Sequence, residues 1–167
     1  MLPDIIKKNL KILFVGINPG TRSGQIGHHF AGHSNRFWKF LYESGLTVVK
    51  LDPTEDRLLL EYDYGITNIA PRVTATAAEL TAAELKEGAL VLKQLIVDYH
   101  PRVVAYMGKV VYQYLAQQKE FQWGVQSQAV IEGIIDFVIP NPSGLNRMPA
   151  AEQLKYYQEL KELIAKL

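Results

Sequence analysis

The chain has 167 residues, of which 48% are hydrophobic and 21% charged, and its formal net charge is +1. This composition is ordinary for a globular protein, and the length fits one domain, residues 1–167, with a core of its own. The absence of cysteine excludes disulfides, thiol catalysis, iron–sulfur clusters and cysteine-ligated zinc, and the small net charge excludes a strong overall electrostatic field. Because no apolar run approaches a membrane span and no basic, apolar leader opens the chain, we expect a cytoplasmic protein, in the cytoplasm or nucleoid of a bacterium.

The first predicted element is a buried strand. The apolar run from Lys11 to Ile17 predicts this strand, and Asn18-Pro19-Gly20 predicts a turn directly after it. Residues 20–34 hold four glycines and three histidines without periodicity, so we expect a long loop there. Long loops in compact domains are usually functional.

Two helices are expected next. Ser34 or Asn35 can cap the first of them, which ends at Gly45. The second begins at Asp52-Pro53, with proline at its first position, and runs to about Tyr62. The apolar face of the first helix is predicted to consist of Phe37, Trp38, Leu41 and Tyr42.

The remaining elements alternate between strands and helices. Thr81 and Glu84 form a capping box that predicts the start of a helix, and His100-Pro101 predicts its end. Strands are expected over Tyr64–Ile69, Arg102–Met107, Gln128–Ile131 and Ile134–Ile139, the last two joined at Glu132-Gly133, and helices over Val110–Gln117 and from about Ala151 to the end. The buried stripes of the two long helices are predicted to be Leu85, Ala89, Leu92, Ile96 and Tyr99, and Leu154, Tyr157, Leu160, Ile164 and Leu167.

This alternation predicts an α/β fold, a three-layer α/β/α sandwich around a central, mainly parallel sheet. Ligands of such sheets bind beyond the carboxyl ends of the strands. Asn18, Gly108 and Asn141 each follow a predicted strand, and Asn68 and Arg72 lie at the end of the second one. Because right-handed crossovers bring these ends to one edge of the sheet, the two Asn-Pro turns, at Asn18 and Asn141, are expected to face one cleft.

Five segments, in order and at consistent spacing, resemble the mismatch-specific uracil-DNA glycosylase / thymine-DNA glycosylase family, which is part of the uracil-DNA glycosylase superfamily. The similarity extends from about Ile12 to the final helix. The segments are VGINPG, HFAGHSNRFWKFLYESGLT, YGITNIAPR, LKEGALVLKQLIVDYHPRVVAYMGK and PNPSGLNR.

The resemblance implies a DNA-repair enzyme with the glycosylase fold and no cofactor. Such an enzyme flips uracil out of a G mispair in double-stranded DNA and hydrolyses its N-glycosidic bond, which leaves an abasic site for base excision repair. Related damaged pyrimidines such as ethenocytosine are expected substrates, and thymine is a further candidate. Neither Asn-Pro motif contains a lysine that could form a Schiff base, so we expect a monofunctional glycosylase. We also expect it to act as a monomer and away from membranes.

The resemblance makes Asn18 the catalytic residue. Cleavage develops an oxocarbenium-like sugar and an anionic base, so the attacking water needs alignment more than deprotonation. An amide oxygen can accept a hydrogen bond from this water. The related uracil-specific family is similar to GQDPYH here, with Asp and Tyr in place of Asn18 and Gly20. The amide predicts slower turnover, and the glycine predicts room for larger pyrimidine substituents.

The base-binding residues implied by the resemblance are Ile17, Gly20, Phe30 and Asn68. Phe30 corresponds to the family aromatic that stacks on the flipped base. Asn68 lies where some bacterial members have lysine and the thymine-excising branch has asparagine, which favours a broad substrate range. Backbone N–H groups of the loop after the first strand are expected to stabilise the leaving base.

The second Asn-Pro motif resembles a DNA wedge. Leu145, flanked by Gly144 and Arg147, is expected to enter the duplex and fill the space that the flipped base vacates. Asn146 and nearby backbone groups are expected to bind the widowed guanine, and Asn141 and Ser143 the backbone of the flipped nucleotide. The uracil-specific family is similar to HPSPLS here, so Asn141 replaces a histidine, which again predicts a weaker catalyst.

Simpler interpretations exist for each motif. Asn-Pro-Gly is ordinary turn chemistry, the second motif can be an exposed turn with one leucine, and Phe30 can be a loop anchor. The same fold could serve a non-catalytic module that binds mispairs. A small-molecule nucleotide-binding enzyme is a further alternative, and it would have no use for Leu145.

The histidine side chains raise the question of a metal site, and the basic side chains that of a phosphate-binding patch. His28, His29 and His33 suggest a metal, but no second cluster supplies partners, so we expect them to shape the loop or contact phosphate, with no metal bound. A phosphate-binding patch is predicted from Arg22, Arg36, Lys39, Arg72, Lys109 and Arg147.

Overall fold

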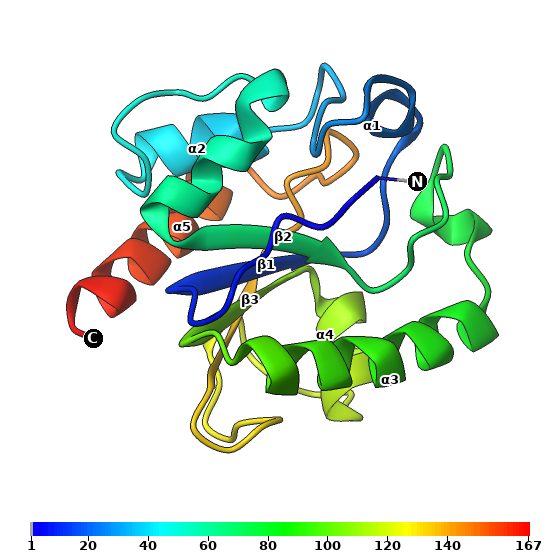
Figure 1. Cartoon of the computed structure of the whole chain (residues 1–167), viewed down its shortest axis with the longest axis vertical. Helices are drawn as coiled ribbons and strands as arrows, with labels where there is room; N and C mark the ends of the chain where they lie inside the picture. Colours follow the sequence, from blue (N-terminus) through cyan, green and yellow to red (C-terminus); the bar gives the residue numbers. More distant parts are fainter. Residues whose placement is uncertain (1) are drawn as a thin grey trace.

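The computed structural model describes residues 2–167 and contains a central five-stranded sheet (Figure 1). The strand order is β2-β1-β3-β5-β4. Four strands are parallel, and the short β4 pairs antiparallel with β5 at one border. The strands are β1 (Ile12–Gly16), β2 (Tyr64–Asn68), β3 (Val103–Met107), β4 (Gly124–Val125) and β5 (Ile135–Ile139).

Helices cover both faces of the sheet, which confirms the three-layer α/β/α architecture. One layer contains α2, η1 and α5, and the other contains α3 and α4 (Figure 1). The helices are α1 (Thr21–Ile26), α2 (Phe37–Glu43), η1 (Pro53–Tyr62), η2 (Ala77–Glu79), α3 (Ala82–Tyr99), α4 (Lys109–Ala116) and α5 (Ala150–Ala165), where η denotes a 3₁₀ helix.

The alternating side chains of β1 join the layers. Ile12 and Phe14 pack in the core beneath α2 and α5, whereas Leu13 and Val15 pack in the core above α3 and α4. Successive residues of a strand point to opposite faces, so a continuous apolar run is what a strand covered on both sides requires. This is why the run after Lys11 predicts a buried strand, and every residue of β1 is buried.

Two of the three helix starts predicted from capping residues form capping boxes. The hydroxyl of Thr81 accepts the N–H of Glu84 at 3.1 Å, and the carboxylate of Glu84 accepts the N–H of Thr81 at 3.0 Å. Asp52 and Glu55 form the same reciprocal box at η1. The predicted helix after Asp52 is therefore confirmed in position, although it is a 3₁₀ helix. The third helix, α2, begins after Arg36, which makes no side-chain cap, and Oδ1 of Asn35 accepts the N–H of Phe37 at 2.9 Å.

Several sequence expectations are wrong. Residues 20–34 are not all loop, because α1 forms within them and ends at Gly27, whose positive φ of 75° suits glycine. Residues 128–131 form no strand, since the carboxylate of Asp136 accepts the N–H of Val130 at 2.8 Å, and β5 pairs with β4 instead. Tyr42 and Leu167, expected to be buried, are 48% and 43% exposed.

Within residues 2–167, no helix combines the length and the apolar character that crossing a bilayer requires.

The carboxyl ends of the parallel strands lie at one edge, as predicted. Backbone hydrogen bonds join the segments that leave them: Ile69 N–H to Gly16 O at 2.9 Å, and Gly108 N–H to Ile139 O at 2.7 Å. Both Asn-Pro turns therefore begin at the same edge of the sheet.

Candidate active site

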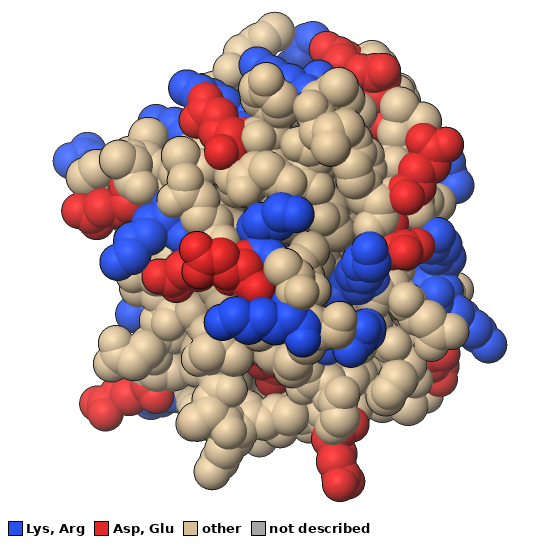
Figure 2. All heavy atoms as spheres, turned by 90° about the vertical axis from the view of Figure 1, so that its left-hand side faces the viewer, with Lys and Arg blue, Asp and Glu red and all other residues tan. Residues whose placement is uncertain are grey.

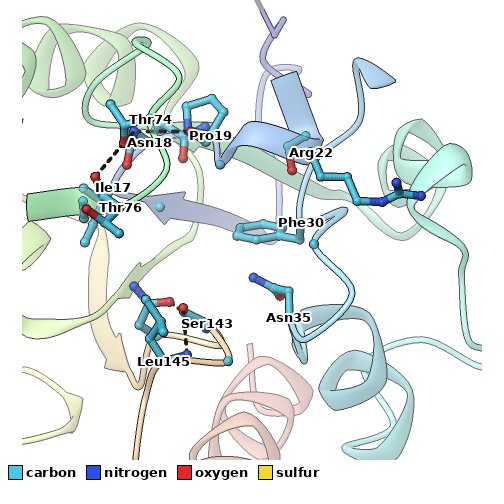
Figure 3. Close-up of a pocket in the computed structure, with 18 of the residues that line it drawn as sticks. Ile17, Asn18, Pro19, Arg22, Phe30, Asn35, Thr74, Thr76, Ser143 and Leu145 are labelled. Atoms are coloured by element: carbon cyan, nitrogen blue, oxygen red, sulfur yellow. Dashed lines mark hydrogen bonds between the residues drawn. The ribbon is translucent and has the colours of Figure 1, made fainter. Parts of the chain in front are cut away.

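A cavity of about 450 Å³ opens at this edge of the sheet (Figure 3). It collects residues from the ends of β1, β2, β3 and β5. All residues predicted to act on the base or the flipped nucleotide line it, except Arg147. The predicted residues in its wall are Ile17, Asn18, Gly20, Phe30, Asn68, Asn141, Ser143, Gly144, Leu145 and Asn146.

The amide of Asn18 is held by its nitrogen. Its Nδ2 donates to the carbonyl oxygen of Arg72 at 2.8 Å and to Oγ1 of Thr74 at 2.7 Å. Figure 3 shows Thr74 beside Asn18. Thr74 donates its own proton to the carbonyl oxygen of Thr76 at 2.8 Å, so its hydroxyl can only accept from Asn18. Two fixed acceptors thus determine which way the amide faces.

The oxygen of the same amide is free. No hydrogen bond from residues 2–167 reaches Oδ1 of Asn18, although the residue lines the cavity and is only partly exposed. An oriented amide with an unused oxygen is a fixed hydrogen-bond acceptor. It can hold a water molecule without removing a proton from it.

The sequence places Arg72 at the same edge of the sheet as Asn18, but it does not predict that residues 72–76 hold the Asn18 amide. Thr74 is buried, and its N–H donates to the carbonyl oxygen of Pro19 at 3.2 Å, so residues 72–76 run alongside the turn after β1. Arg72 and Thr74 lie 54 and 56 positions from Asn18. Nothing in the local sequence indicates this pairing.

Asn68 forms the floor of the cavity beside Gly16. A Cβ at position 16 would come within 2.6 Å of Oδ1 of Asn68, so glycine is required for this close approach. The amide of Asn68 has no side-chain hydrogen-bond partner among the described residues. It therefore offers one donor group and one acceptor to whatever enters the cavity.

Phe30 both fixes its loop to the core and lines the cavity. Its ring lies 4.2 Å, centroid to centroid, from the ring of Phe37 in the core, and it also lines the cavity (Figure 3). Its backbone has a φ of 52°, which is unusual for a residue with a side chain. The surrounding contacts hold it there: Ala31 N–H donates to Oγ of Ser23 at 3.0 Å, and Arg22 Nε donates to Ala31 O at 3.0 Å.

The histidines near Phe30 hold the loop in place. The buried carboxylate of Asp56 accepts the N–H of His29 at 2.9 Å and lies 3.1 Å from Nδ1 of His28. Nε2 of His29 lies 2.8 Å from the carbonyl oxygen of Pro3, and burial lowers the pKa of this imidazole. A neutral ring donating from Nε2 fits both facts. Across residues 2–167, no three His, Asp or Glu side chains are grouped to hold a metal.

Gly20 leaves open space in the wall. A Cβ at this position would meet no atom within 4 Å, and its φ of −78° suits any residue. The glycine is therefore not needed for the turn itself. Its effect is to leave this part of the cavity unfilled.

The second turn, residues 141–147, is termed the wedge loop. Its polar side chains bond mainly within the loop: Asn141 Oδ1 accepts Ser143 N–H at 2.9 Å, and Asn146 Nδ2 donates to Asn141 O at 2.9 Å. Oδ1 of Asn146 also accepts Met148 N–H at 3.0 Å, so both ends of that amide are engaged. These bonds leave the apolar side chain of Leu145 77% exposed at the cavity mouth.

The wedge loop packs directly on the loop that carries Phe30. The N–H of Arg36 donates to the carbonyl oxygen of Pro142 at 2.9 Å. A Cβ on Gly144 would overlap the side chain of Ser34 and approach its carbonyl oxygen to 3.0 Å. Gly144 thus permits the contact between the two loops, and the sequence offered Ser34 only as a possible helix cap, not as this contact.

The six predicted phosphate-binding cations do not form one patch. Arg72 forms a 2.8 Å ion pair with Glu84, and its hydrogen bonds lower the pKa of that carboxyl group to about 2. The ammonium of Lys109 lies over the ring of Trp123 at 4.9 Å. Arg147 is exposed and lies outside the cavity wall. The side of the molecule on which the C-terminus lies, on the left in Figure 1, shows Lys and Arg side chains interspersed with Asp and Glu (Figure 2).

Two comparisons with known proteins identify the family and the fold. Residues 3–165 match the family model of the uracil DNA glycosylase superfamily. The chain is also similar in structure to the solution NMR structure of a candidate uracil DNA glycosylase from Methanosarcina acetivorans, with a TM-score of 0.62 and 17% sequence identity over 96% of each chain. At this identity the second match shows a shared fold.

Proposed function

The chain belongs to the uracil DNA glycosylase superfamily, and from this membership and the geometry of the cavity we propose that it removes uracil from G mispairs in double-stranded DNA. The base is flipped into the cavity and its N-glycosidic bond is hydrolysed, which leaves an abasic site. The observation that carries this proposal is the amide of Asn18, anchored through its nitrogen with its oxygen free in the cavity.

Asn18 aligns the attacking water in the proposed mechanism. Departure of the base develops positive charge on the sugar and negative charge on the base. Water can add to such a sugar without a strong base, provided that it is held over the anomeric carbon. The fixed oxygen of Asn18 accepts one hydrogen bond from this water. Once the water oxygen has bonded to the sugar, the proton that it loses passes to the departed anionic base or to solvent. The neutral amide does not stabilise the cationic sugar as a carboxylate would, so slow turnover is expected.

Stabilisation of the leaving base is assigned to the backbone N–H groups of Ile17, Asn18 and Gly20, which line the cavity. A preorganised donor aimed at a developing anion contributes about 10²–10³ in rate. Asn141, which replaces the histidine of the uracil-specific family, is neutral and gives no ionic assistance. Bases that leave easily are therefore the better substrates.

Base recognition is assigned to Phe30 and Asn68. The ring of Phe30 is braced by Phe37 and can stack on a pyrimidine. The unpartnered amide of Asn68 can both donate to and accept from a base edge, so it suits several pyrimidines. The open space at Gly20 admits substituents at the 5-position. We therefore include related lesions such as ethenocytosine in the proposed range, with thymine as a further candidate.

Leu145 is assigned the role of the wedge. An apolar side chain exposed at the mouth of a polar cavity can enter the base stack and offset the stacking lost on flipping. Because the amide of Asn146 is engaged inside its own loop, we assign recognition of the widowed guanine to backbone groups of the wedge loop. Asn141 Nδ2 and the Ser143 hydroxyl proton remain for the backbone of the flipped nucleotide.

We further propose that the enzyme is monofunctional. A glycosylase that also cuts the strand forms a Schiff base through an amine, and no lysine lines the cavity among residues 2–167. The proposed product is thus an intact strand with an abasic site. We propose that the protein acts as a monomer.

The direct test is incubation with a duplex that contains one G·U pair, followed by alkali. Strand breaks after alkali, and none before it, are the expected result. No breaks in either case, with duplex binding retained, would favour a non-catalytic module that binds mispairs. The absence of both strand breaks and duplex binding would favour an enzyme that binds small-molecule nucleotides. A matched duplex with G·C at the same position is the control.

A further inference from the structure

A second cavity, of about 670 Å³, adjoins the first across the loop that carries Phe30. The two cavities share Arg22, Phe30 and three residues between 32 and 35, which form the wall between them. Figure 3 shows the guanidinium of Arg22 extending past Phe30, away from Asn18. A strand that leaves the first cavity over this wall would pass the second one.

Four cations line this second cavity, here termed the basic pocket. They are Arg22, Arg36, Lys39 and Lys50. One acid, Asp52, accompanies them, and its carboxylate caps η1 by accepting the N–H of Thr54 at 3.0 Å and its hydroxyl at 2.6 Å. The basic pocket thus carries a local excess of positive charge on a protein whose net charge is only +1.

The cations of the basic pocket are poorly neutralised. Arg36 has no acceptor for its guanidinium among residues 2–167, and its Nη1 is shielded from solvent without a partner. Arg22 uses only Nε, on Ala31 O, which leaves its terminal nitrogens available. Lys39 lies 3.9 Å from Glu43 in an exposed pair, a geometry that contributes little. Arg72, by contrast, is fully paired with Glu84 at 2.8 Å.

We propose that the basic pocket binds backbone phosphates of the DNA strand that continues from the flipped nucleotide. This inference rests on the proposed function, because it names where the substrate strand runs. Guanidinium and ammonium groups left without carboxylates suit phosphate oxygens, and a strand carries a charge about every 3.4 Å along the helix axis. Phosphate contacts there would hold the strand in register while its base occupies the neighbouring cavity.

The number of these phosphate contacts can be measured from the salt dependence of DNA binding. The probe is a G·U duplex whose uracil nucleotide carries a 2′-fluorine, so that its bond is not cut. The affinity for DNA falls as salt rises, and each phosphate contact adds about 0.9 to the magnitude of the slope of log affinity against log salt concentration. The double variant Lys39→Gln/Lys50→Gln should therefore lower the slope by about 1.8 and weaken matched and mispaired duplexes alike. Arg36→Gln should lower it by about 0.9.

The matched control is Lys8→Gln/Lys166→Gln, which removes the same charge before β1 and after α5. A slope for the Lys39/Lys50 variant equal to that of this control would overturn the proposal. Because Lys39 and Lys50 are exposed, this outcome stays decisive even if Arg36→Gln unfolds the protein. Excision of unmodified uracil by the wild-type protein, measured in parallel, separates failure of the basic pocket from failure of the proposed glycosylase activity.

Discussion

The two Asn-Pro turns at the edge of the sheet share a dipeptide, but the asparagine amide is hydrogen-bonded through its nitrogen in one turn and through its oxygen in the other. Asn18 donates from Nδ2 to a segment more than 50 residues away and keeps its oxygen free. Asn141 accepts through Oδ1 from Ser143, two residues along, and keeps Nδ2 free among the described contacts. The first amide therefore presents an acceptor to the cavity, and the second presents a donor.

This difference explains why one motif suits catalysis and the other suits DNA binding. A water molecule that must attack a sugar is oriented by a hydrogen-bond acceptor, whereas phosphate and sugar oxygens need donors. The dipeptide alone does not decide between these roles. The hydrogen-bond partners of each amide determine its role, and the partners of the Asn18 amide come from a distant part of the chain.

The largest expected effect separates the two asparagines. Asn18→Ala should lower the single-turnover rate of uracil excision by at least about 10²–10³, since it removes a preorganised contact of the transition state. Its affinity for the uncleavable duplex should remain within about twofold. Asn141→Ala should lower the rate only about fivefold, as expected for one lost hydrogen bond of about 1 kcal/mol. Equal losses of rate and binding in Asn18→Ala would indicate a structural role for that residue.

Substitution of the residue after the first Asn-Pro should narrow the substrate range. Gly20→Tyr places a ring in open space, and we expect it to reduce excision of 5-substituted or bulkier pyrimidines relative to uracil by about 10–200-fold, the range that shape discrimination allows. Rates on a panel of mispaired bases measure this ratio. Gly20→Ala, which adds only a methyl group there, is the control. Unchanged excision of bulky bases by Gly20→Tyr would contradict a steric role for this position.

The second turn should matter only for duplexes. Leu145→Ala should lower excision from a G·U duplex about tenfold, which corresponds to about 1.4 kcal/mol of lost wedge contact, and leave single-stranded substrate nearly unaffected. Val48→Ala alters an equally exposed apolar residue, 80% exposed, and is the matched control. An equal effect of Leu145→Ala on both substrates would argue against intercalation.

The smallest expected effect concerns the partner that orients Asn18. Thr74→Val keeps the shape but removes the acceptor of the 2.7 Å hydrogen bond. The carbonyl of Arg72 still holds the amide, so the rate should fall by about 2- to 12-fold, in line with about 0.5–1.5 kcal/mol. Thr74→Ser should restore it. A stability loss in Thr74→Val without any change in rate would show that the threonine only supports the fold.

Much of the fold follows from local sequence. Capping residues such as Thr81 and Asp52 act within one helical turn, and the apolar run of β1 reflects burial on both faces, so both are readable from short windows. The glycines of residues 20–34 hide α1, because Gly24 lies inside this helix. The segment at residues 128–131 has apolar character, but a side chain, that of Asp136, takes its N–H.

The site was predicted only in part for the same reason. Residues in the two motifs, such as Asn18 and Leu145, were placed at one cleft because parallel strands share an edge. Thr74 and Ser34 contribute through tertiary contacts with residues more than 50 positions away, which no local pattern records. Asn146 also shows that a polar residue in a motif can be engaged within its own loop.

The most direct measurement of the central claim is a crystal structure of the protein with a G·U duplex that carries the 2′-fluorinated, uncleavable uracil nucleotide. We expect the flipped base between Phe30 and Asn68, and one water within hydrogen-bond distance of Oδ1 of Asn18 that faces the anomeric carbon. An Asn18 oxygen turned away from that carbon, with no polar group or water at its place, would contradict the account.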